Sequence, residues 1–241
     1  MLRLTRFLIL ALLATSLSAC VWLHLLELKN QLAKFDENFS TEASDHFTLV
    51  FKNPVLVNDD FVTLAKLEPT SKETTPTGSR WIQAFHKIDA EGNKQPGVDF
   101  FFTMDFDQDD RLTRWDFSRL FMTMVPAKFF EDSIRSLAKG RVDEASRKYR
   151  VDPKDRAKIT EPPPTLQQIK DAMGEPLEKT KEDGKNVYVY RFQVDSPWID
   201  KDFQDRRFTD VRLYFDPKTH ELTRMGGRFI GLKININLVK G

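Results

Sequence analysis

Cysteine is nearly absent from this chain, since Cys20 is the only one among 241 residues. A disulfide needs two cysteines, so a framework of internal disulfides is excluded. A surplus of positive charge is also missing, because 37 lysine and arginine residues stand against 36 aspartate and glutamate residues. Proteins that bind nucleic acid carry a concentrated positive surface, and this balance predicts none. We therefore expect no nucleic-acid partner.

The chain also lacks the short motifs that carry common enzyme chemistry. It contains no G-x-S-x-G, no glycine-rich phosphate loop and no His-Glu-x-x-His. No two of its four histidines stand at metal-ligand spacing, and there is no second cysteine to help them. His86, in a predicted strand, is interpreted as an ordinary hydrogen-bonded polar residue. We expect no catalytic residue, no metal and no cofactor.

The amino terminus has the layout of a secretory signal. Arg3 and Arg6 precede the apolar run FLILALLATS, and small residues lead from that run directly into Cys20. The segment Leu-Ser-Ala-Cys at 17–20 resembles a bacterial lipobox, whose cysteine is lipidated while the preceding signal is removed. The resemblance predicts a signal peptide over 1–20, a lipid on Cys20 and membrane attachment through that lipid.

Two destinations follow from two interpretations of this segment. Val21, and not an aspartate, follows the cysteine, so a lipoprotein is expected at the periplasmic face of the outer membrane. Alternatively, Phe7–Leu26 contains no Lys, Arg, Asp or Glu and is long enough to span a bilayer as an uncleaved helix. Arg3 and Arg6 would then hold the amino terminus in the cytoplasm, with the protein in the inner membrane.

Four segments are predicted after the signal. They are an amphipathic helix (21–45), a first α+β repeat (46–125), connecting helices (126–158) and a second α+β repeat (159–241). In the first segment, apolar residues recur at spacings of three and four, which is typical of one helix face. We expect this face to pack on the following domain; its members are Leu25, Leu28, Leu32, Phe35 and Phe39.

Strands and short helices alternate along the rest of the chain. Strands are predicted at 46–51, 80–89, 99–106, 111–117, 187–195, 208–216, 221–229 and 230–238, and residues 118–125 are expected to complete the first sheet. Helices are predicted at 56–69, 126–137, 142–149 and 165–176. The polar segments 72–79 and 179–185 are interpreted as a loop and a turn. In the last strand, even-numbered apolar residues from Ile230 to Leu238 alternate with a second face, which predicts one buried side.

The two halves of the chain can be aligned with each other. Segments 56–69, 80–89 and 106–114 match segments 163–176, 186–195 and 215–224 in the same order. The fold class predicted from this pattern is α+β: two tandem repeats, each with helices packed on one face of a small antiparallel sheet, after an amino-terminal anchor helix.

The second half also resembles a known family. TLQQIKDAMGEP, DGKNVYVYRF and VRLYFDPKTHELTR are similar to the SmpA/OmlA domain, the module of the small BamE-type outer-membrane assembly lipoproteins. Tandem copies of this general fold occur in the secreted β-lactamase inhibitory protein. The resemblance covers residues 160–228, and residues 46–118 only through the internal repeat. It implies a helix ending in Gly-x-Pro before a small sheet, and a role in outer-membrane assembly.

The most distinctive loop is SPWIDKDFQDRR at 196–207. It places Trp198 and Phe203 among charged residues, and aromatic rings beside an arginine such as Arg206 are typical of protein interfaces. We expect these three residues to bind a partner; the alternative is that both rings pack under the sheet. A second acidic stretch, DFDQDDRLTRWD at 105–116, is interpreted as a solvated hairpin turn, because a calcium loop needs glycine where Asp110 stands.

Two functions are consistent with these observations. The first is a membrane-anchored, non-catalytic module of the cell envelope that binds another envelope protein or takes part in assembly. The second is an envelope hydrolase or a carrier of a small ligand, with a groove between the two repeats. A deep pocket with converging polar groups would favour the second.

Overall fold

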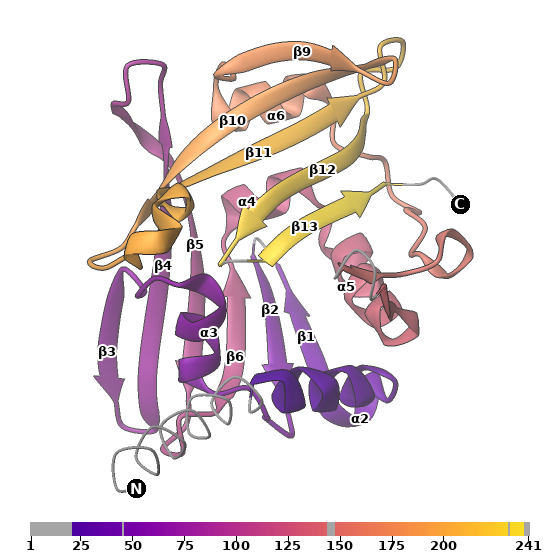
Figure 1. The fold of residues 1–241 in the computed structure, drawn as a ribbon. Coiled ribbons are helices and arrows are strands. Elements are labelled where there is room, and N and C mark those ends of the chain that lie inside the picture. Colours follow the sequence, from indigo (N-terminus) through magenta and orange to yellow (C-terminus); the bar gives the residue numbers. More distant parts are fainter. Residues whose placement is uncertain (1–20, 45, 144–147, 231, 239–241) are drawn as a thin grey trace, which may run out of the picture.

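The computed structural model describes residues 21–44, 46–143, 148–230 and 232–238 (Figure 1). In these ranges the chain forms one antiparallel sheet of eleven strands and a separate two-stranded hairpin. Nine strands of the sheet follow one another in the order β1-β2-β6-β5-β4-β10-β11-β12-β13, while β3 pairs with β4 and β9 pairs with β10. Strand is therefore the dominant structure of the described residues.

The element bounds are as follows. The first-half strands are β1 (Phe39–Ala43), β2 (Phe47–Phe51), β3 (Ser71–Thr75), β4 (Gly78–Ile88), β5 (Lys94–Phe106) and β6 (Leu112–Phe117), and the hairpin is β7 (Arg141–Asp143) with β8 (Lys148–Arg150). The second-half strands are β9 (Glu178–Glu182), β10 (Lys185–Asp195), β11 (Phe208–Phe215), β12 (Leu222–Phe229) and β13 (Leu232–Asn237). Residues 21–32 are helical, and the further helices are α2 (Phe35–Asn38), α3 (Asn58–Ala65), α4 (Arg119–Met124), α5 (Ala127–Ser136), α6 (Leu166–Met173), η1 (Leu137–Lys139), η2 (Pro153–Asp155) and η3 (Lys201–Arg207).

The predicted fold class is wrong. The two halves do not form separate small sheets covered by their own helices, because residues 84–87 of β4 pair antiparallel with residues 192–195 of β10. This pairing joins the halves into one continuous sheet, which curves as it passes from β4 to β10 (Figure 1). Both strands would otherwise expose a row of unpaired backbone groups at a sheet edge, and pairing them removes both edges.

The main hydrophobic core lies on one face of this sheet. Side chains alternate across a strand, and in β5 the residues Phe100, Phe102, Met104 and Phe106 are all buried. They belong to the same cluster as residues of β10, β11 and β12, so a single core serves both halves. Two helices, α4 and α6, also contribute to it, and they contact each other. The opposite face of the sheet carries cross-strand ion pairs such as Arg191 with Asp210.

Similar local geometry recurs in the two halves, although they share one sheet. Thr113 Oγ1 donates a hydrogen bond to the carbonyl of Asp105 (3.0 Å), and Thr223 Oγ1 donates one to the carbonyl of Tyr214 (2.9 Å). In both places the register of the strand pair shifts directly after the acceptor. The two Leu-Thr-Arg segments begin β6 and β12, which are the corresponding strands of the two alignable segments.

Three polar segments differ from their predicted structure. The predicted loop at 72–79 contains most of β3, and the predicted turn at 179–185 contains most of β9. Residues 39–43, predicted partly as the end of a helix, form β1. β3 and β9 expose most of their side chains to solvent, so they lack the apolar alternation by which strands are recognised in a sequence.

Two apolar segments also differ. Residues 119–124, expected to complete the first sheet, form α4, whose buried residues Phe121 and Met124 stand three positions apart, as one helix face requires. Within the predicted helix at 142–149, residues 142–143 belong to β7 and residues 148–149 to β8. Val142 and Tyr149, which suggested a helical spacing, are cross-strand partners in that hairpin.

The amino-terminal amphipathic face packs on the core, as predicted. Leu32, Phe35 and Phe39 are buried, and Leu25 and Leu28 are partly buried against the same cluster. The apolar face of the last strand is also confirmed, because Ile236 and Leu238 are buried while Lys233 and Asn235 are exposed. Among the described residues, no helix combines the length and the apolar character that crossing a bilayer requires.

Candidate functional site

The predicted lipidation site, Cys20, lies outside the described residues, as does the whole predicted signal peptide at 1–20. The other three predicted site residues, Trp198, Phe203 and Arg206, lie in the connection between β10 and β11. We call residues 196–207 the Trp198 loop. Residues 201–207 of this loop form η3.

The Trp198 loop is fixed to the first half of the chain by backbone hydrogen bonds. The amide of Glu68 donates to the carbonyl of Trp198 (3.0 Å), and the amide of Asp200 donates to the carbonyl of Lys66 (2.9 Å). Ser196 Oγ also donates to the carbonyl of Trp198 (2.6 Å). These contacts hold the backbone of Trp198 while leaving its side chain in solvent, since the residue is 50% exposed.

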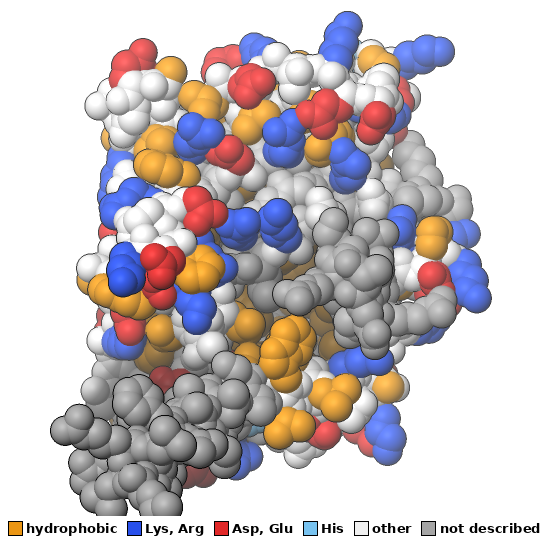
Figure 2. Space-filling model, in the orientation of Figure 1, with side chains coloured by type: hydrophobic (Ala, Val, Ile, Leu, Met, Phe, Trp, Pro, Cys, Tyr) orange, Lys and Arg blue, Asp and Glu red, His pale blue; other side chains and the backbone are white. Residues whose placement is uncertain are grey.

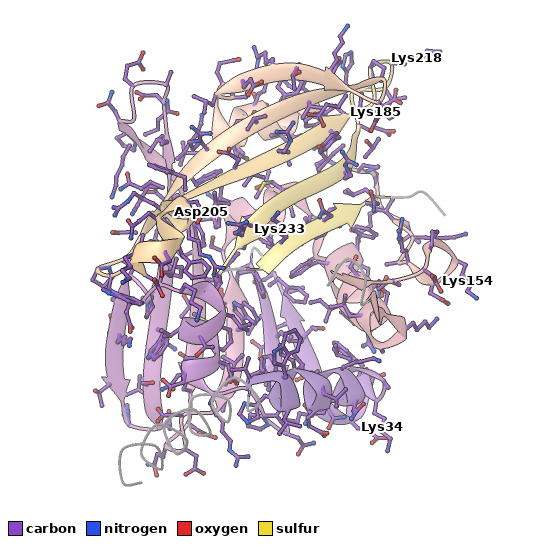
Figure 3. The ribbon with its side chains drawn as sticks, viewed as in Figure 1. Lys34, Lys154, Lys185, Asp205, Lys218 and Lys233 are labelled. Atoms are coloured by element: carbon purple, nitrogen blue, oxygen red, sulfur yellow. The ribbon has the colours of Figure 1, made fainter. Side chains whose placement is uncertain are left out.

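The other end of the loop is held by charge pairs. Arg228 Nη1, on β12, donates to a carboxylate oxygen of Asp205 at 2.6 Å. Asp205 is labelled in Figure 3. The guanidinium of Arg206 lies over the ring of Phe203, 4.5 Å from its centroid, and Lys66 Nζ lies 5.9 Å from the same centroid. The ring of Phe203 therefore packs against cations of its own chain, and Trp198 is the more exposed of the two predicted aromatic contacts.

Arg206 serves an intramolecular contact. Its Nη1 donates to the carbonyl of Leu64, in the last turn of α3, where carbonyls have no partner within the helix. Burial lowers the pKa of Arg206, and the nearby Arg228 acts in the same direction. A guanidinium remains charged despite such a shift, so Arg206 places a positive charge at the negative end of the α3 dipole.

Lys87 makes the reciprocal contact at the end of α6. This lysine lies on β4, is 1% exposed, and donates from Nζ to the carbonyls of Met173 (2.5 Å) and Glu175 (2.6 Å). The hydroxyl of Tyr190 donates to the carbonyl of Gly174 between them (3.3 Å). Burial lowers the pKa of Lys87, while the negative charge of Glu175 opposes that shift. Each half of the chain thus supplies the cation that meets the carboxyl-terminal end of the other half's helix.

A histidine bridges the two halves on the opposite face of the sheet. His86 Nδ1 lies 2.9 Å from Asp99 Oδ1, and His86 Nε2 lies 3.3 Å from Asp195 Oδ2. The prediction that His86 is a hydrogen-bonded polar residue is confirmed. Two exposed aromatic rings lie on strands close to His86. Phe101, on β5, pairs with Ala84 of β4, and Phe208, on β11, pairs with Gln193, the register partner of His86 on β10.

Two small cavities lie beside the junction of the two halves. One cavity, of about 10 Å³, is lined by residues of both halves that include Gln83, Arg206 and Thr209, and a second cavity of about 10 Å³ lies beside Trp81. A volume of this size holds about one water molecule. Arg206 Nε is buried without a protein hydrogen-bond partner, and Arg206 is one of the residues that line the first cavity.

The acidic stretch at 105–116 is the hairpin turn between β5 and β6, as predicted. Its carboxylates are engaged in different places: Asp105 binds Arg80 (2.6 Å), and Asp116 accepts from Thr48 (2.6 Å). Asp107 accepts from the amides of the turn itself, at Asp109 and Arg111. Within the part of the chain that the structure describes, no three His, Cys, Asp or Glu side chains gather in a way that suits a metal ion.

Comparison with known proteins gives no relative. No family model, no curated protein and no solved structure matches this chain. The resemblance of residues 160–228 to the SmpA/OmlA domain therefore stays a prediction from the sequence.

Sequence reasoning missed the two helix-end contacts. A lysine in a strand, such as Lys87, carries no local signal that it will be buried against a helix end more than 80 residues away. It also missed a second apolar face on the amino-terminal helix. That face was visible in the sequence, because Trp22, Leu23 and Leu26 stand at helical spacing opposite the face at Leu25 and Leu28.

Proposed function

We propose that this protein is a non-catalytic binding module of the cell envelope, attached to a membrane at its amino terminus and presenting Trp198 to a protein partner. The attachment is supported by Leu-Ser-Ala-Cys at 17–20, directly after an apolar run. A role in outer-membrane assembly is the finer form of this proposal and is supported only by the resemblance to the SmpA/OmlA domain.

The observation that carries the binding role is the state of Trp198. Its backbone is held by Glu68 and Ser196, yet half of its surface is exposed. A large ring on a fixed backbone loses little conformational entropy on binding, and such rings often dominate interface energies. Phe203 and Arg206 support the loop from within. This divides the three predicted contact residues into one that meets the partner and two that position it.

The small cavities between the halves do not support a ligand carrier or a hydrolase. Sites for small molecules are clefts of about 300–1,000 Å³. The cavities beside Gln83 and Trp81 are each about 10 Å³. We therefore place the working surface on the outside of the molecule.

Replacement of Cys20 tests the attachment. Cells that express the wild-type protein and are given an alkyne fatty acid should yield a labelled protein, and Cys20→Ala should abolish the label, because the chain has no other thiol. The measured mass of the mature wild-type protein should also correspond to a chain without residues 1–19. Equal labelling of both proteins, or a mature chain that keeps residues 1–19, would remove the lipoprotein form and leave the uncleaved helix.

Replacement of Trp198 tests the binding role. After cross-linking in intact cells, the amount of partner recovered with Trp198→Ala should be at least tenfold lower than with the wild-type protein. A central aromatic contact typically contributes about 2 kcal/mol or more. The control is Lys201→Ala, which removes an exposed side chain from the same loop without removing a ring. Both variants should melt within about 2 °C of the wild type, since surface changes are usually worth under about 0.5 kcal/mol. Undiminished recovery with Trp198→Ala would place the interface elsewhere.

A further inference from the structure

The amino-terminal helix has a second apolar face that points away from the core. Trp22 is 67% exposed, Leu23 is 63% exposed and Leu26 is 55% exposed. Positions i, i+1 and i+4 lie on one side of a helix, so the three side chains form a single patch. Figure 2 shows hydrophobic side chains gathered over this helix, in the lower part of the view. We call these three residues the outer patch.

The orientation of this helix is fixed from its inner side. His24 Nδ1 lies 2.8 Å from a carboxylate oxygen of Asp60, which is itself buried at the start of α3. In the last turn of the helix, Gln31 Nε2 donates to the carbonyl of Asn53 (2.8 Å). With Val21 and Leu32 also buried, the helix cannot roll to hide the outer patch without breaking these contacts.

The exposed side of the helix changes character along its length. It is apolar at the outer patch and polar afterwards, at the exposed residues Glu27 and Asn30. Lys34 follows the carboxyl-terminal end of the helix, where it is exposed; it is labelled in Figure 3. At a rise of 1.5 Å per residue, the outer patch lies within about 8 Å of Val21, the first described residue, along the helix axis. The apolar part of the exposed side is therefore at the amino-terminal end of the helix.

We propose that the outer patch inserts into the interface of the lipid bilayer, so that the helix fixes how the folded body stands on the membrane. The proposal rests on the membrane attachment in the proposed function. With a lipid on Cys20, one residue separates the attachment from Trp22. With an apolar helix through residues 7–26, Trp22 lies in the last two turns of that helix. In both cases the ring is placed near the lipid surface. Tryptophan and leucine on one side of a helix suit that interface.

Tryptophan fluorescence provides a direct test. The full-length protein is incorporated into vesicles of phosphatidylethanolamine and phosphatidylglycerol, with or without lipids brominated on the acyl chains near the headgroup. Bromine should reduce the emission of the wild-type protein. Trp22→Phe should lose the whole quenched fraction, whereas Trp198→Phe should keep it, because Trp198 lies on the loop after β10. Equal quenching in both variants would overturn the proposal.

A second pair of variants tests the patch without removing its reporter. Leu23→Ser with Leu26→Ser should reduce the bromine quenching of Trp22, while Glu27→Ser with Asn30→Ser, on the same exposed side, should leave it unchanged. All four positions are exposed, so the melting temperature should hardly move in either variant. Equal effects of the two pairs on quenching would also overturn the proposal.

Flotation of the same samples separates this inference from the proposed function. Wild-type protein that floats with the vesicles while Trp22 is not quenched would overturn the insertion of the patch and leave the attachment standing. Protein that does not float would overturn both. If neither brominated lipid nor aqueous iodide quenches Trp22, the chain's own amino-terminal residues cover the patch, and the lipid proposal is again overturned.

Discussion

Replacing Phe100 by alanine should lower the free energy of unfolding by about 3–5 kcal/mol, which is the usual range for deleting a buried aromatic ring. Phe100 is fully buried, and its ring centroid lies 4.4 Å from that of Phe85 and 4.8 Å from that of Phe192. It also meets Phe121 (6.0 Å) and Phe229 (5.9 Å). The ring therefore joins strands of both halves to α4, and its loss leaves a cavity at the centre of the shared core.

The neighbouring residue gives a matched control. Phe101 follows in the same strand but faces the opposite side and is 38% exposed. Phe101→Ala should change the stability by about 0.5 kcal/mol or less. At about 2–4 °C per kcal/mol for a chain of this size, Phe100→Ala should melt about 6–20 °C below the wild type. Circular dichroism during heating measures both, and similar melting temperatures would mean that the two faces of β5 are misassigned.

Lys87→Met should lower the free energy of unfolding by about 2–4 kcal/mol. Methionine keeps most of the length of the side chain but cannot donate to the carbonyls of Met173 and Glu175. A buried acceptor left without its donor costs about 1–3 kcal/mol. Part of this loss is offset, because the variant no longer buries a charge, a cost reflected in the lowered pKa of Lys87.

The control for this variant is Lys94→Met, at an exposed position at the start of β5. It should leave the stability within about 0.5 kcal/mol of the wild type. Hydrogen exchange adds a local measurement: amides of α6 should exchange faster in Lys87→Met, because the end of that helix loses its cation. A variant that is as stable as the wild type, with unchanged exchange in α6, would show that the lysine contributes no net stability.

Strands with one buried face could be predicted from the sequence because their apolar residues alternate. Phe100, Phe102 and Met104 alternate with less buried residues, and the same holds for the last strand around Ile236. The short helices α3 and α6 were equally recognisable. Both helices are indicated by apolar residues at helical spacing. The end of α6 is also marked by Gly174, whose φ of +68° suits glycine and few other residues.

The fold class could not be predicted because it depends on one non-local pairing. The sequences of residues 84–87 and 192–195 do not show whether each strand lies at the edge of its own small sheet or pairs with the other. Pairing uses backbone groups, which every sequence provides. The internal similarity of the two halves favoured two separate sheets. Lys87 and Arg206 distinguish the two alternatives, but each binds carbonyls of the other half. Their roles can therefore be recognised only once the two halves are known to be in contact.

The composition of residues 196–207 was enough to predict the candidate site. It was not enough to predict which residues of the site are exposed. The loop with Trp198 and Phe203 was expected to bind a partner, and most of its charged residues are exposed. Which ring is exposed depends on contacts with Lys66 and with Arg206, and Arg206 is itself positioned by the end of α3. The contacts of Lys66 with Phe203 and of Leu64 with Arg206 join residues more than 100 positions apart. The side of the helix on which Trp22 lies, by contrast, follows from helical spacing alone.

The pairing of β4 with β10 has a consequence for the order of folding. Lys87 and Phe192 are register partners although 105 residues separate them. A ribosome adds about 5–20 residues per second, so the inner edge of β4 exists for several seconds before its partner is made. During that time the first half carries an open edge beside exposed phenylalanines, the combination that most readily pairs with another chain. If the predicted amino-terminal signal directs secretion before folding, this risk is postponed until both halves are present together.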